Sequence, residues 1–391
     1  MGFCSKGSLD VKSLFVAGGI VPNRPRSKSQ ETNRSMKKVR ILFMPPVDVG
    51  SVNAQSLNVR ELVLRFDPER LESTLWYAAE PDPRLRDRVG IRLLQLPSSR
   101  KTVRILREQL AGYDLIGYTD CSPATYIFLH LPRALRKGTA TVYHAEGSNP
   151  AAQLASVSTL TRRLYQGILP NCDVHTAITD CVARDMEGMR VSSQYILPVG
   201  VDLRSFSPPA SRTNTTPTVL FVGTLIERKG PADVVRAAAH FPHVRFRLVG
   251  SARDGYEGVL QRSVAQRGLR NVTIEGPKTQ QEIAEIMRES DILLLPSRLE
   301  GMPKVTLEAA ATGLPCIVFN DYQTPSVVHG VTGFQVSSFD EMVKSLGTLL
   351  QDSELRRRMG AEARQHVQQF DWEVVAKTWA NAYLEIAAAR T

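Results

Sequence analysis

Two glutamates lie eight residues apart in the stretch DILLLPSRLEGMPKVTLEAAATGLP, which covers residues 291–315. Asp291–Leu295 is an apolar run typical of a buried strand, and Lys304–Thr312 is rich in helix-forming residues. Glu300 is therefore expected on the loop at the carboxyl end of a strand, and Glu308 inside the following helix. Ligands bind at this edge of parallel sheets, and a helix start favours phosphate. Because carboxylates repel phosphate but accept hydrogen bonds from diols, the pair predicts a sugar beside a phosphate. The alternative is an ordinary strand–helix unit with two surface glutamates.

Two adjacent cations, Arg228 and Lys229, lie in the loop of TVLFVGTLIERKGPADVV, between an expected strand and an expected helix. Beside a helix start they would clamp a phosphate without a metal ion, although a solvated pair at the surface is the alternative. The chain contains no Walker lysine motif, GxGxxG, HExxH or nucleophile elbow, and no Asp-x-Asp pair. We therefore expect a phosphate site with no metal and no cofactor.

Two further candidates come from the first half of the chain. Val39–Pro46 is an apolar run that leads into a turn at Gly50, which is a weak phosphate signal because it is a single glycine. His144 lies in TATVYHAEG, where an expected strand meets its loop. A histidine there can donate to a sugar hydroxyl or stabilise a developing charge. A structural histidine bonded to the backbone is the other interpretation.

The elements that must position these residues alternate between strand and helix, which predicts parallel sheets covered on both faces. A Pro-rich stretch, residues 208–217, is expected to link two domains. A helix is expected over 124–136, and one over 160–169 carries Arg162 and Arg163 and either touches a membrane or packs on the core. In the second half, strands are expected at 244–250, 271–276, 316–320 and 330–336, with helices at 255–267, 279–289, 340–351, 353–367 and from 371.

Length and composition narrow the class of protein. A chain of 391 residues with 42% hydrophobic residues can form two domains with full cores. The five cysteines are scattered, which fits a reduced, cytoplasmic protein. Of the net charge of +10, residues 1–40 carry +7, since they hold nine Lys/Arg and two Asp/Glu. The near-neutral remainder argues against nucleic-acid binding, and residues 1–36 are expected to form a disordered leader.

Several stretches occur together in the order known from one family. They are ILPVGVDLRSF (196–206), VGTLIERKG (222–230), the E-x7-E of Glu300 and Glu308, GVTGF (330–334) and FDWEVVA (370–376). In this order they resemble the family 4 retaining glycosyltransferases, the group 1 type, closely over residues 194–385 and more loosely over 37–193. The resemblance implies an α/β fold of GT-B architecture, with two Rossmann-like doubly wound parallel-sheet domains facing across a cleft.

The domains would be an acceptor-binding domain at 37–205, a linker at 206–217, a nucleotide-sugar domain at 218–370 and a helix at 371–391 that returns to the first domain. The reaction implied is transfer of a sugar from a nucleotide-diphosphate sugar, with retained configuration and without metal. The acceptor would be a glycan, a lipid-linked sugar or a small molecule, in glycan biosynthesis, with peripheral membrane contact as an open question. Acceptor specificity would come from loops of the first domain near Asn53, Gln55, Tyr118 and Glu146.

The resemblance also implies roles for single residues. Lys229 would neutralise the leaving diphosphate with Arg228 as helper, Glu300 would bond the donor sugar, and Glu308 would hold the ribose. His144 would stand near the reacting sugar. The segment after Gly276 would face the base, and the backbone at Met302, Pro303 and Lys304 would meet sugar or phosphate.

One departure from the family pattern concerns the diphosphate. Thr224 stands where the family usually has arginine, so one cation is missing, and Arg228 is the candidate to replace it. This leaves two alternatives to an active transferase. One is a binding protein with an impaired site, and the other is a phosphorylase or epimerase on the same fold.

Overall fold

The computed structural model describes residues 38–44, 49, 54–119, 122–132, 134–147, 158–211 and 216–389. The predicted leader, Gly50 and Asn53 lie outside these residues, as does part of the predicted linker.

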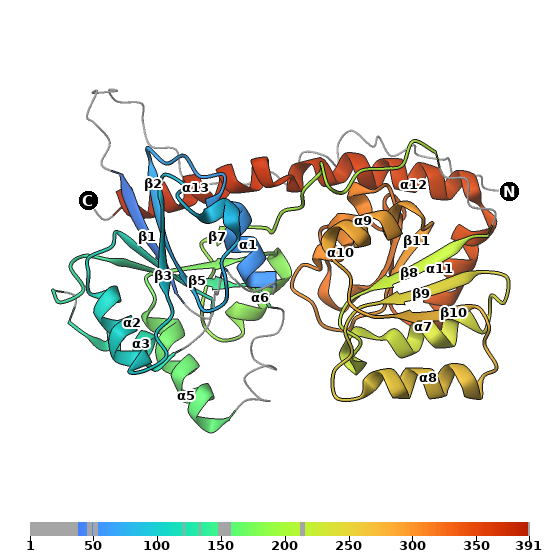
Figure 1. The fold of residues 1–391 in the computed structure, drawn as a ribbon, viewed down its shortest axis with the longest axis horizontal. Helices are drawn as coiled ribbons and strands as arrows, with labels where there is room; N and C mark the ends of the chain where they lie inside the picture. The colour runs from blue at the N-terminus through green and yellow to red at the C-terminus, as the bar shows by residue number, and fades with distance from the viewer. Residues whose placement is uncertain are drawn as a thin grey trace, which may run out of the picture. The chain divides into compact units, whose positions relative to one another are not determined.

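The first domain is built on a seven-stranded parallel sheet in the order β3-β2-β1-β4-β5-β6-β7 (Figure 1). The central strands are short and buried, which explains their near-continuous apolar sequence. The order reverses between β1 and β4, and such a switch point is where ligands bind in open α/β sheets. The strands are β1 (Val39–Phe43), β2 (Leu71–Tyr77), β3 (Ile91–Gln95), β4 (Leu115–Tyr118), β5 (Ala140–Ala145), β6 (Val174–Ala177) and β7 (Tyr195–Ile196).

Helices cover both faces of this sheet because the chain first runs outward from β1 to β3 and then back through β4 to β7. Right-handed crossovers place the helices of the two runs on opposite faces. The cores separate accordingly, since α1 (Ala54–Val63) packs with one cluster of buried residues and the returning helices with another. The returning helices are α2 (Lys101–Gln109), α3 (Pro123–His130), α5 (Thr159–Ile168) and α6 (Asp180–Glu187).

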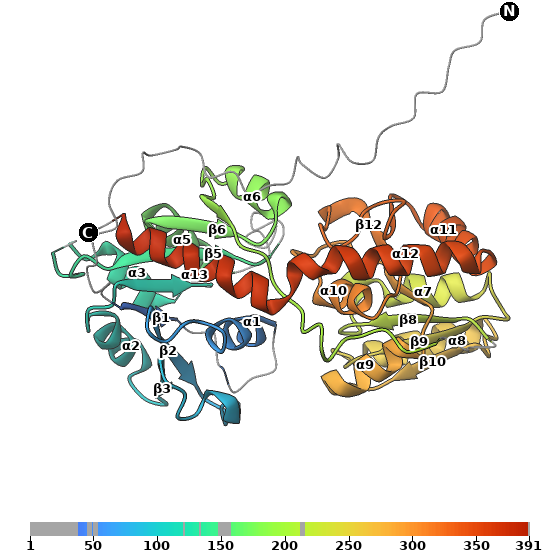
Figure 2. The same cartoon turned by 90° about the horizontal axis from the view of Figure 1, so that it is seen from above.

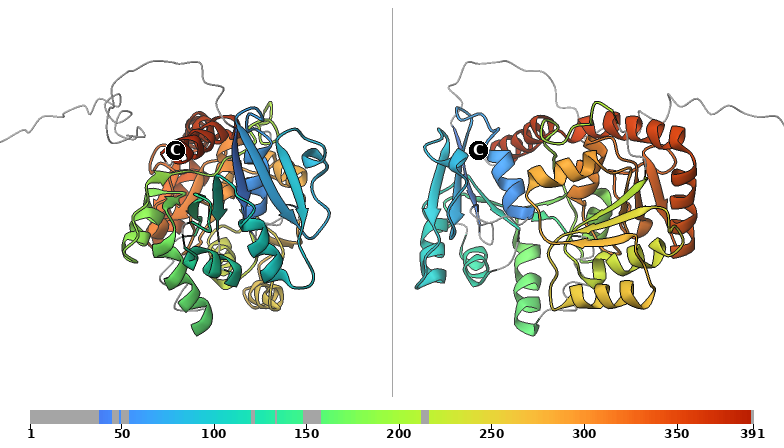
Figure 3. Two further views of the ribbon diagram at one scale, coloured as in Figure 1. Left: turned by 90° about the vertical axis from the view of Figure 1, so that its left-hand side faces the viewer. Right: turned by 45° about the vertical axis from the view of Figure 1, so that its right-hand side comes forward.

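The second domain repeats the plan with a six-stranded parallel sheet in the order β10-β9-β8-β11-β12-β13. Here the order reverses between β8 and β11, and α7 and α8 cover the face opposite to α9, α10 and α12 (Figures 1 and 3). The strands are β8 (Thr218–Val222), β9 (Arg245–Val249), β10 (Val272–Glu275), β11 (Ile292–Leu295), β12 (Cys316–Phe319) and β13 (Gly333–Val336). The helices are α7 (Pro231–Ala238), α8 (Tyr256–Gln266), α9 (Gln280–Arg288), α10 (Lys304–Ala311), α11 (Phe339–Gln351) and α12 (Ser353–His366).

The last helix, α13 (Trp372–Ala388), lies beside α1 and completes the core of the first domain (Figure 2). Asp371 caps its start by accepting a hydrogen bond from the Glu373 amide at 2.7 Å. Trp379 donates its indole N–H to the Pro198 carbonyl at 2.9 Å. A segment more than 170 residues from the end of the first sheet therefore becomes part of that domain's interior.

The sequence analysis was wrong about one helix and missed two strands. The helix expected over 124–136 ends at His130, because Pro132 cannot continue it and restricts the residue before it. Strands β2 and β3 carry polar and charged residues among their apolar ones, so no clear period marked them. The remaining elements of the second domain lie within a few residues of their expected places.

Candidate functional site

The loop after β8 packs directly on the loop after β11. It forms a short 3-10 turn, Glu227–Lys229, that ends at Gly230 with φ of 72°. A Cβ atom at Gly230 would lie 2.3 Å from the Pro296 carbonyl oxygen, so only glycine permits this close approach. The strand β8 is the neighbour of β11 in the sheet, so the two loops meet at the point where the strand order reverses.

Lys229 and Glu300, 71 residues apart, meet across these loops. The Lys229 ammonium forms an ion pair with the Glu300 carboxylate, which also accepts a hydrogen bond from the Ser297 hydroxyl at 2.6 Å. Only 20% of the Lys229 side chain and 11% of the Glu300 side chain are exposed. The structure thus brings together two predicted residues and holds the carboxylate from two sides.

Arg228 lies beside this pair. Its guanidinium donates to the Leu299 carbonyl and lies 4.0 Å from the Glu300 carboxylate. Its side chain is 45% exposed, so it keeps donors that can reach a ligand. Two cations therefore stand at the switch point, at the carboxyl ends of β8 and β11.

The first turn of α10 follows at once. Met302 and Pro303 are buried, Lys304 is the first residue of the helix and Pro303 takes the capping position. The amides of this turn have no partner within the helix, and the helix dipole makes the end favourable for negative charge. This is the arrangement that phosphate requires.

Glu308 lies one turn further along α10, four residues after Lys304. It is half-buried, and burial raises its pKa while the Lys304 ammonium opposes the rise. Burial lowers the pKa of Lys304, and the charges of Glu308, Glu61 and Glu146 oppose that shift. The Lys304 ammonium also lies 5.4 Å from the centre of a ring of Trp372. Lys304 is therefore a positive charge shared by three carboxylates.

His144 lies within β5 and is only 2% exposed. Its Nδ1 is 2.8 Å from the Thr176 hydroxyl, and its Nε2 is 3.0 Å from the Tyr383 hydroxyl on α13. Burial lowers its pKa to about 3, so the ring is neutral at physiological pH. Both ring nitrogens already have partners, and the strand continues one residue past it.

Glu146, two residues later, stands at the end of β5, and the sequence analysis placed it only among the loops of acceptor specificity. A Cβ at Gly301 would lie 2.2 Å from its carbonyl oxygen, so Glu146 touches the residue that follows Glu300. Burial raises its pKa to about 7, and the Lys304 charge and the Asn58 amide oppose the rise. The sequence could have indicated Glu146 as a site residue through its position at a strand end, but the same signal applied equally to His144.

Gly276 follows β10 at the edge of the sheet, and no atom lies within 4 Å of a Cβ built on it. Gly276 is exposed, and none of the described candidate site residues lies within 4 Å of that Cβ position. Gly50 lies outside the described residues. Within the described ranges, no group of three His, Cys, Asp or Glu side chains is arranged to hold a metal ion. In the same ranges every helix is too short or too polar to span a bilayer.

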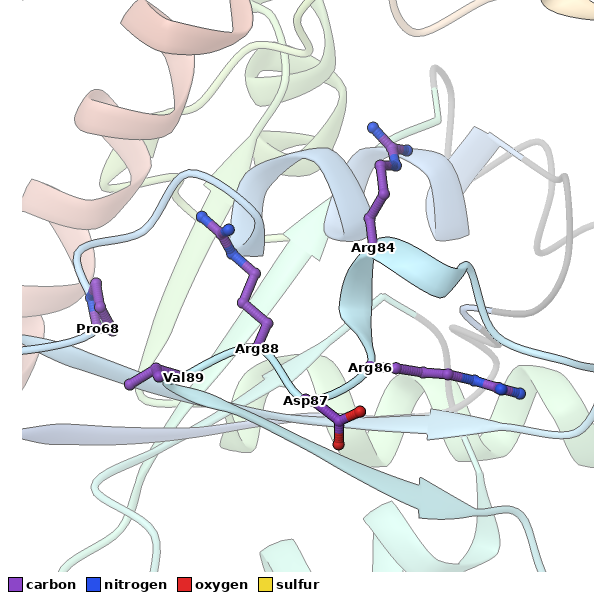
Figure 4. Close-up of a pocket in the computed structure, with 6 residues that line it drawn as sticks. All are labelled: Pro68, Arg84, Arg86, Asp87, Arg88 and Val89. Atoms are coloured by element: carbon purple, nitrogen blue, oxygen red, sulfur yellow. The ribbon is translucent and has the colours of Figure 1, made fainter.

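A hollow of about 430 Å³ lies elsewhere, along the connection from β2 to β3 (Figure 4). Three arginines line it, but Arg84 pairs with Asp82 and Glu61, and Arg88 donates to the Leu64 carbonyl. None of the predicted site residues lines this hollow. It is lined by Pro68, Arg84, Arg86, Asp87, Arg88 and Val89.

Comparison with known proteins gives one family and a set of relatives. The family model described as "Glycosyl transferases group 1" matches residues 204–366. A D-inositol 3-phosphate glycosyltransferase of Corynebacterium jeikeium is 29% identical over 313 residues, which cover 72% of this chain and 75% of that protein. A GDP-mannose-dependent monoacylated alpha-(1-6)-phosphatidylinositol monomannoside mannosyltransferase of Corynebacterium glutamicum is 32% identical over 210 residues. That match covers 47% of this chain and 54% of that protein, so the chain spans about half the length of this relative.

Solved structures with the same fold cover nearly the whole chain. Sucrose-phosphate synthase from Thermosynechococcus elongatus superposes with a TM-score of 0.74 at 22% identity, over 90% of this chain and all of that one. Anabaena Alr3699/HepE in complex with UDP and glucose superposes with a TM-score of 0.71 at 18% identity, over 88% of this chain and 99% of that one. The predicted architecture of two Rossmann-like parallel-sheet domains is confirmed.

Proposed function

We propose that this chain, whose residues 204–366 match the model for glycosyl transferases of group 1, transfers a sugar from a nucleoside-diphosphate sugar to a hydroxyl of an acceptor. The observation that carries the proposal is the contact of Lys229 with Glu300 at the switch point, beside the first turn of α10. Cation, helix amides and carboxylate together suit a ligand that joins a diphosphate to a polyhydroxyl ring.

The diphosphate end of the donor is assigned to Lys229, Arg228 and the α10 amides. As the bond from the sugar to phosphate breaks, its electron pair stays on the diphosphate, and a positioned cation in a partly buried site stabilises that charge. Arg228 is placed to compensate in part for Thr224, because its guanidinium lies 4.0 Å from Glu300 in the same site. An impaired binding protein therefore has less support than an active transferase.

The sugar end is assigned to Glu300 and the ribose to Glu308. Glu300 already accepts two hydrogen bonds, and a ligand hydroxyl would displace or join them. Glu308 is half-buried on α10 and forms no ion pair with the described residues, so its carboxylate suits the hydroxyls of a diol. The base is expected beside the segment after Gly276.

Retention of configuration and independence from metal are further parts of the proposal, and both come from the family. The attacking hydroxyl would approach the face that the diphosphate leaves, and the departing phosphate would take its proton. The domain boundaries at 206–217 and 371 belong to the proposal too, supported by β8 starting at Thr218 and α13 at Trp372. The two domains would close on the substrates during the reaction.

The names of the relatives suggest the acceptor. One acts on D-inositol 3-phosphate and another on an acylated phosphatidylinositol mannoside, so inositol phosphate and an inositol lipid are the acceptors to examine first. A peripheral membrane contact fits the layer formed by α2, α3 and α5, whose outer surface exposes Val103, Ile127 and Leu160. These three helices carry five Lys/Arg and one glutamate, so anionic vesicles should sediment the chain more than neutral ones.

Release of nucleoside diphosphate from UDP- and GDP-sugars, with and without inositol phosphate, tests the function. We expect turnover with at least one pair and a rise in melting temperature with the matching nucleotide. The Glu308→Gln variant should weaken nucleotide binding, while Glu354→Gln on the exposed surface of α12 serves as the control. Binding without any release would favour the impaired protein, and release of a sugar phosphate with inorganic phosphate would favour a phosphorylase.

A further inference from the structure

The end of β5 lies against the loop that carries Glu300. The carbonyl oxygen of Glu146 packs against Gly301. A Cβ atom at Gly301 would also lie 2.7 Å from the Ile178 side chain. Only glycine at 301 lets the strand end approach this closely. Glu146 therefore stands beside the proposed sugar position, on the side that belongs to the first domain.

Among the described residues near Glu146 and Lys304, carboxylates outnumber the cations that are left unpaired. Arg60 is 3.2 Å from Asp82, and Glu61 is 2.7 Å from both Arg65 and Arg84, so these groups satisfy one another. Lys304 remains as the cation near both Glu146 and Glu308, and no ion pair within 4 Å joins it to either in the described part of the chain. The groups that act on Glu146 are Lys304 from α10, Asn58 from α1 and Tyr383 from α13. Glu308 from α10 and Glu61 and Arg60 from α1 act on Lys304 in turn.

The Asn58 side chain, which hydrogen-bonds to Glu146, has one atom without a partner among the described residues. The Asn58 side chain is 5% exposed, and its Oδ1 makes no hydrogen bond with the described residues. A buried acceptor without a donor is energetically unfavourable. The Glu146 carboxylate and the Asn58 amide oxygen therefore lie side by side with little positive charge among the described residues. They suit a ligand that supplies hydrogen-bond donors and carries no negative charge.

We propose that Glu146 and Asn58 bind hydroxyls of the transferred sugar, opposite Glu300, and thereby select neutral sugars over uronic acids and phosphorylated sugars. The inference rests on the proposed function and specifies its donor. A carboxylate or phosphate on the sugar would lie against Glu146 in a site with little water, where like charges repel strongly. A hydroxyl at the same place satisfies both acceptors.

The ionisation of Glu146 gives an independent readout. Its pKa is raised to about 7 in the free protein because it is buried. Hydrogen bonds from hydroxyls stabilise the ionised form and lower the pKa. Binding of the sugar nucleotide at pH 7 should therefore release a fraction of a proton that binding of the nucleoside diphosphate alone does not release.

Calorimetric titration of the full chain with UDP, UDP-glucose and UDP-glucuronate tests this, with the GDP, GDP-mannose and GDP-mannuronate set if guanine is preferred. The native chain should bind the neutral sugar nucleotide at least about tenfold more tightly than the uronate, since one charged hydrogen bond is worth about that much. Glu146→Gln should lose about tenfold in affinity for the neutral sugar nucleotide, keep its affinity for the diphosphate and discriminate less against the uronate.

Two controls separate the possible failures. Glu308→Gln should weaken all three ligands, because its proposed contact is with the ribose. Titration of the native chain in two buffers of different ionisation enthalpy measures the released proton without any variant. Equal binding of neutral and uronate donors, or an unchanged profile in Glu146→Gln, overturns the inference while the transferase remains. Binding of none of these ligands by the native chain counts against the proposed function itself.

Discussion

The two domains carry the same kind of sheet edge but treat their polar residues differently. In the second domain, Lys229 and Glu300 come from loops after neighbouring strands and meet directly. In the first domain, His144 is turned into the core and both its ring nitrogens are occupied. Glu146, two residues further on, reaches the edge instead. His144, inside the end of its strand, therefore points into the core, whereas Lys229 and Glu300, on loops beyond their strands, meet at the sheet edge.

The difference lies in what covers each sheet. The residues of the second domain that meet at the switch point belong to segments of that domain alone. The first domain is closed by α13, from the far end of the chain, and Tyr383 on that helix hydrogen-bonds to His144 across 239 residues of sequence. Trp379 packs beside the same ring, with centroids 5.0 Å apart. A distant helix thus supplies the contacts of a candidate site residue, and the role of His144 near the reacting sugar stays a prediction.

Replacement of Lys229 should have the largest effect. Lys229→Met removes the cation that faces the leaving diphosphate, and we expect kcat to fall by about 10²–10³-fold, the range seen when one stabilising group of a reaction site is lost. Turnover of the donor in steady state measures it. Lys344→Met is the matched control, because Lys344 is exposed on α11, outside the segments assigned to the donor. A fall of less than threefold would remove Lys229 from the site.

The pH dependence of stability should separate Glu146 from His144. Glu146 has a folded pKa of about 7 against a usual 4.5, so the folded state binds the extra proton and stability declines as pH rises from 4.5 to 7. Glu146→Gln should abolish that decline and gain roughly 1–3 kcal/mol at pH 8. His144, with a pKa of about 3, has the opposite sign, since stability is lost as pH falls below 6.5. Denaturant unfolding at a series of pH values measures both pH dependences. If the unfolding free energy of Glu146→Gln changes with pH as steeply as that of the native chain, the prediction for Glu146 is wrong.

The contact between α13 and His144 should matter for stability more than for chemistry. Tyr383→Phe removes the 3.0 Å hydrogen bond to Nε2, and we expect a loss of about 1 kcal/mol of unfolding free energy with kcat nearly unchanged. Thr176→Val tests the other ring nitrogen in the same way. A fall of kcat by 100-fold in a folded variant would instead support the role in sugar transfer that the family resemblance implies for His144.

Arg228 should give the smallest effect. Its side chain is 45% exposed, and surface charges contribute little, so Arg228→Gln should lower kcat/KM by about threefold. The effect should shrink as salt is raised, because exposed charges are screened. If the loss equals that of Lys229→Met, then Arg228 takes over the task of the missing arginine at Thr224 completely.

The sequence alone determined much of the second domain. Short apolar strands, Gly230, and the Glu300 and Glu308 pair follow local rules of strand, turn and helix, and the loops that carry Lys229 and Glu300 must meet because their strands are neighbours. The sequence did not predict strands β2 and β3, because their mixed polar and apolar residues show no clear period of hydrophobicity.

What only the tertiary structure decided is which residue of the β5 end faces the site. His144 and Glu146 share one strand end in the sequence, and their surroundings differ only after α13 and the Gly301 loop have packed against them. Local sequence determines which elements form, because propensity and turn chemistry act over a few residues. Burial, ionisation and hydrogen-bond partners depend on contacts between distant segments, and those contacts buried His144 and left Glu146 to share the charge of Lys304 with Glu308 and Glu61.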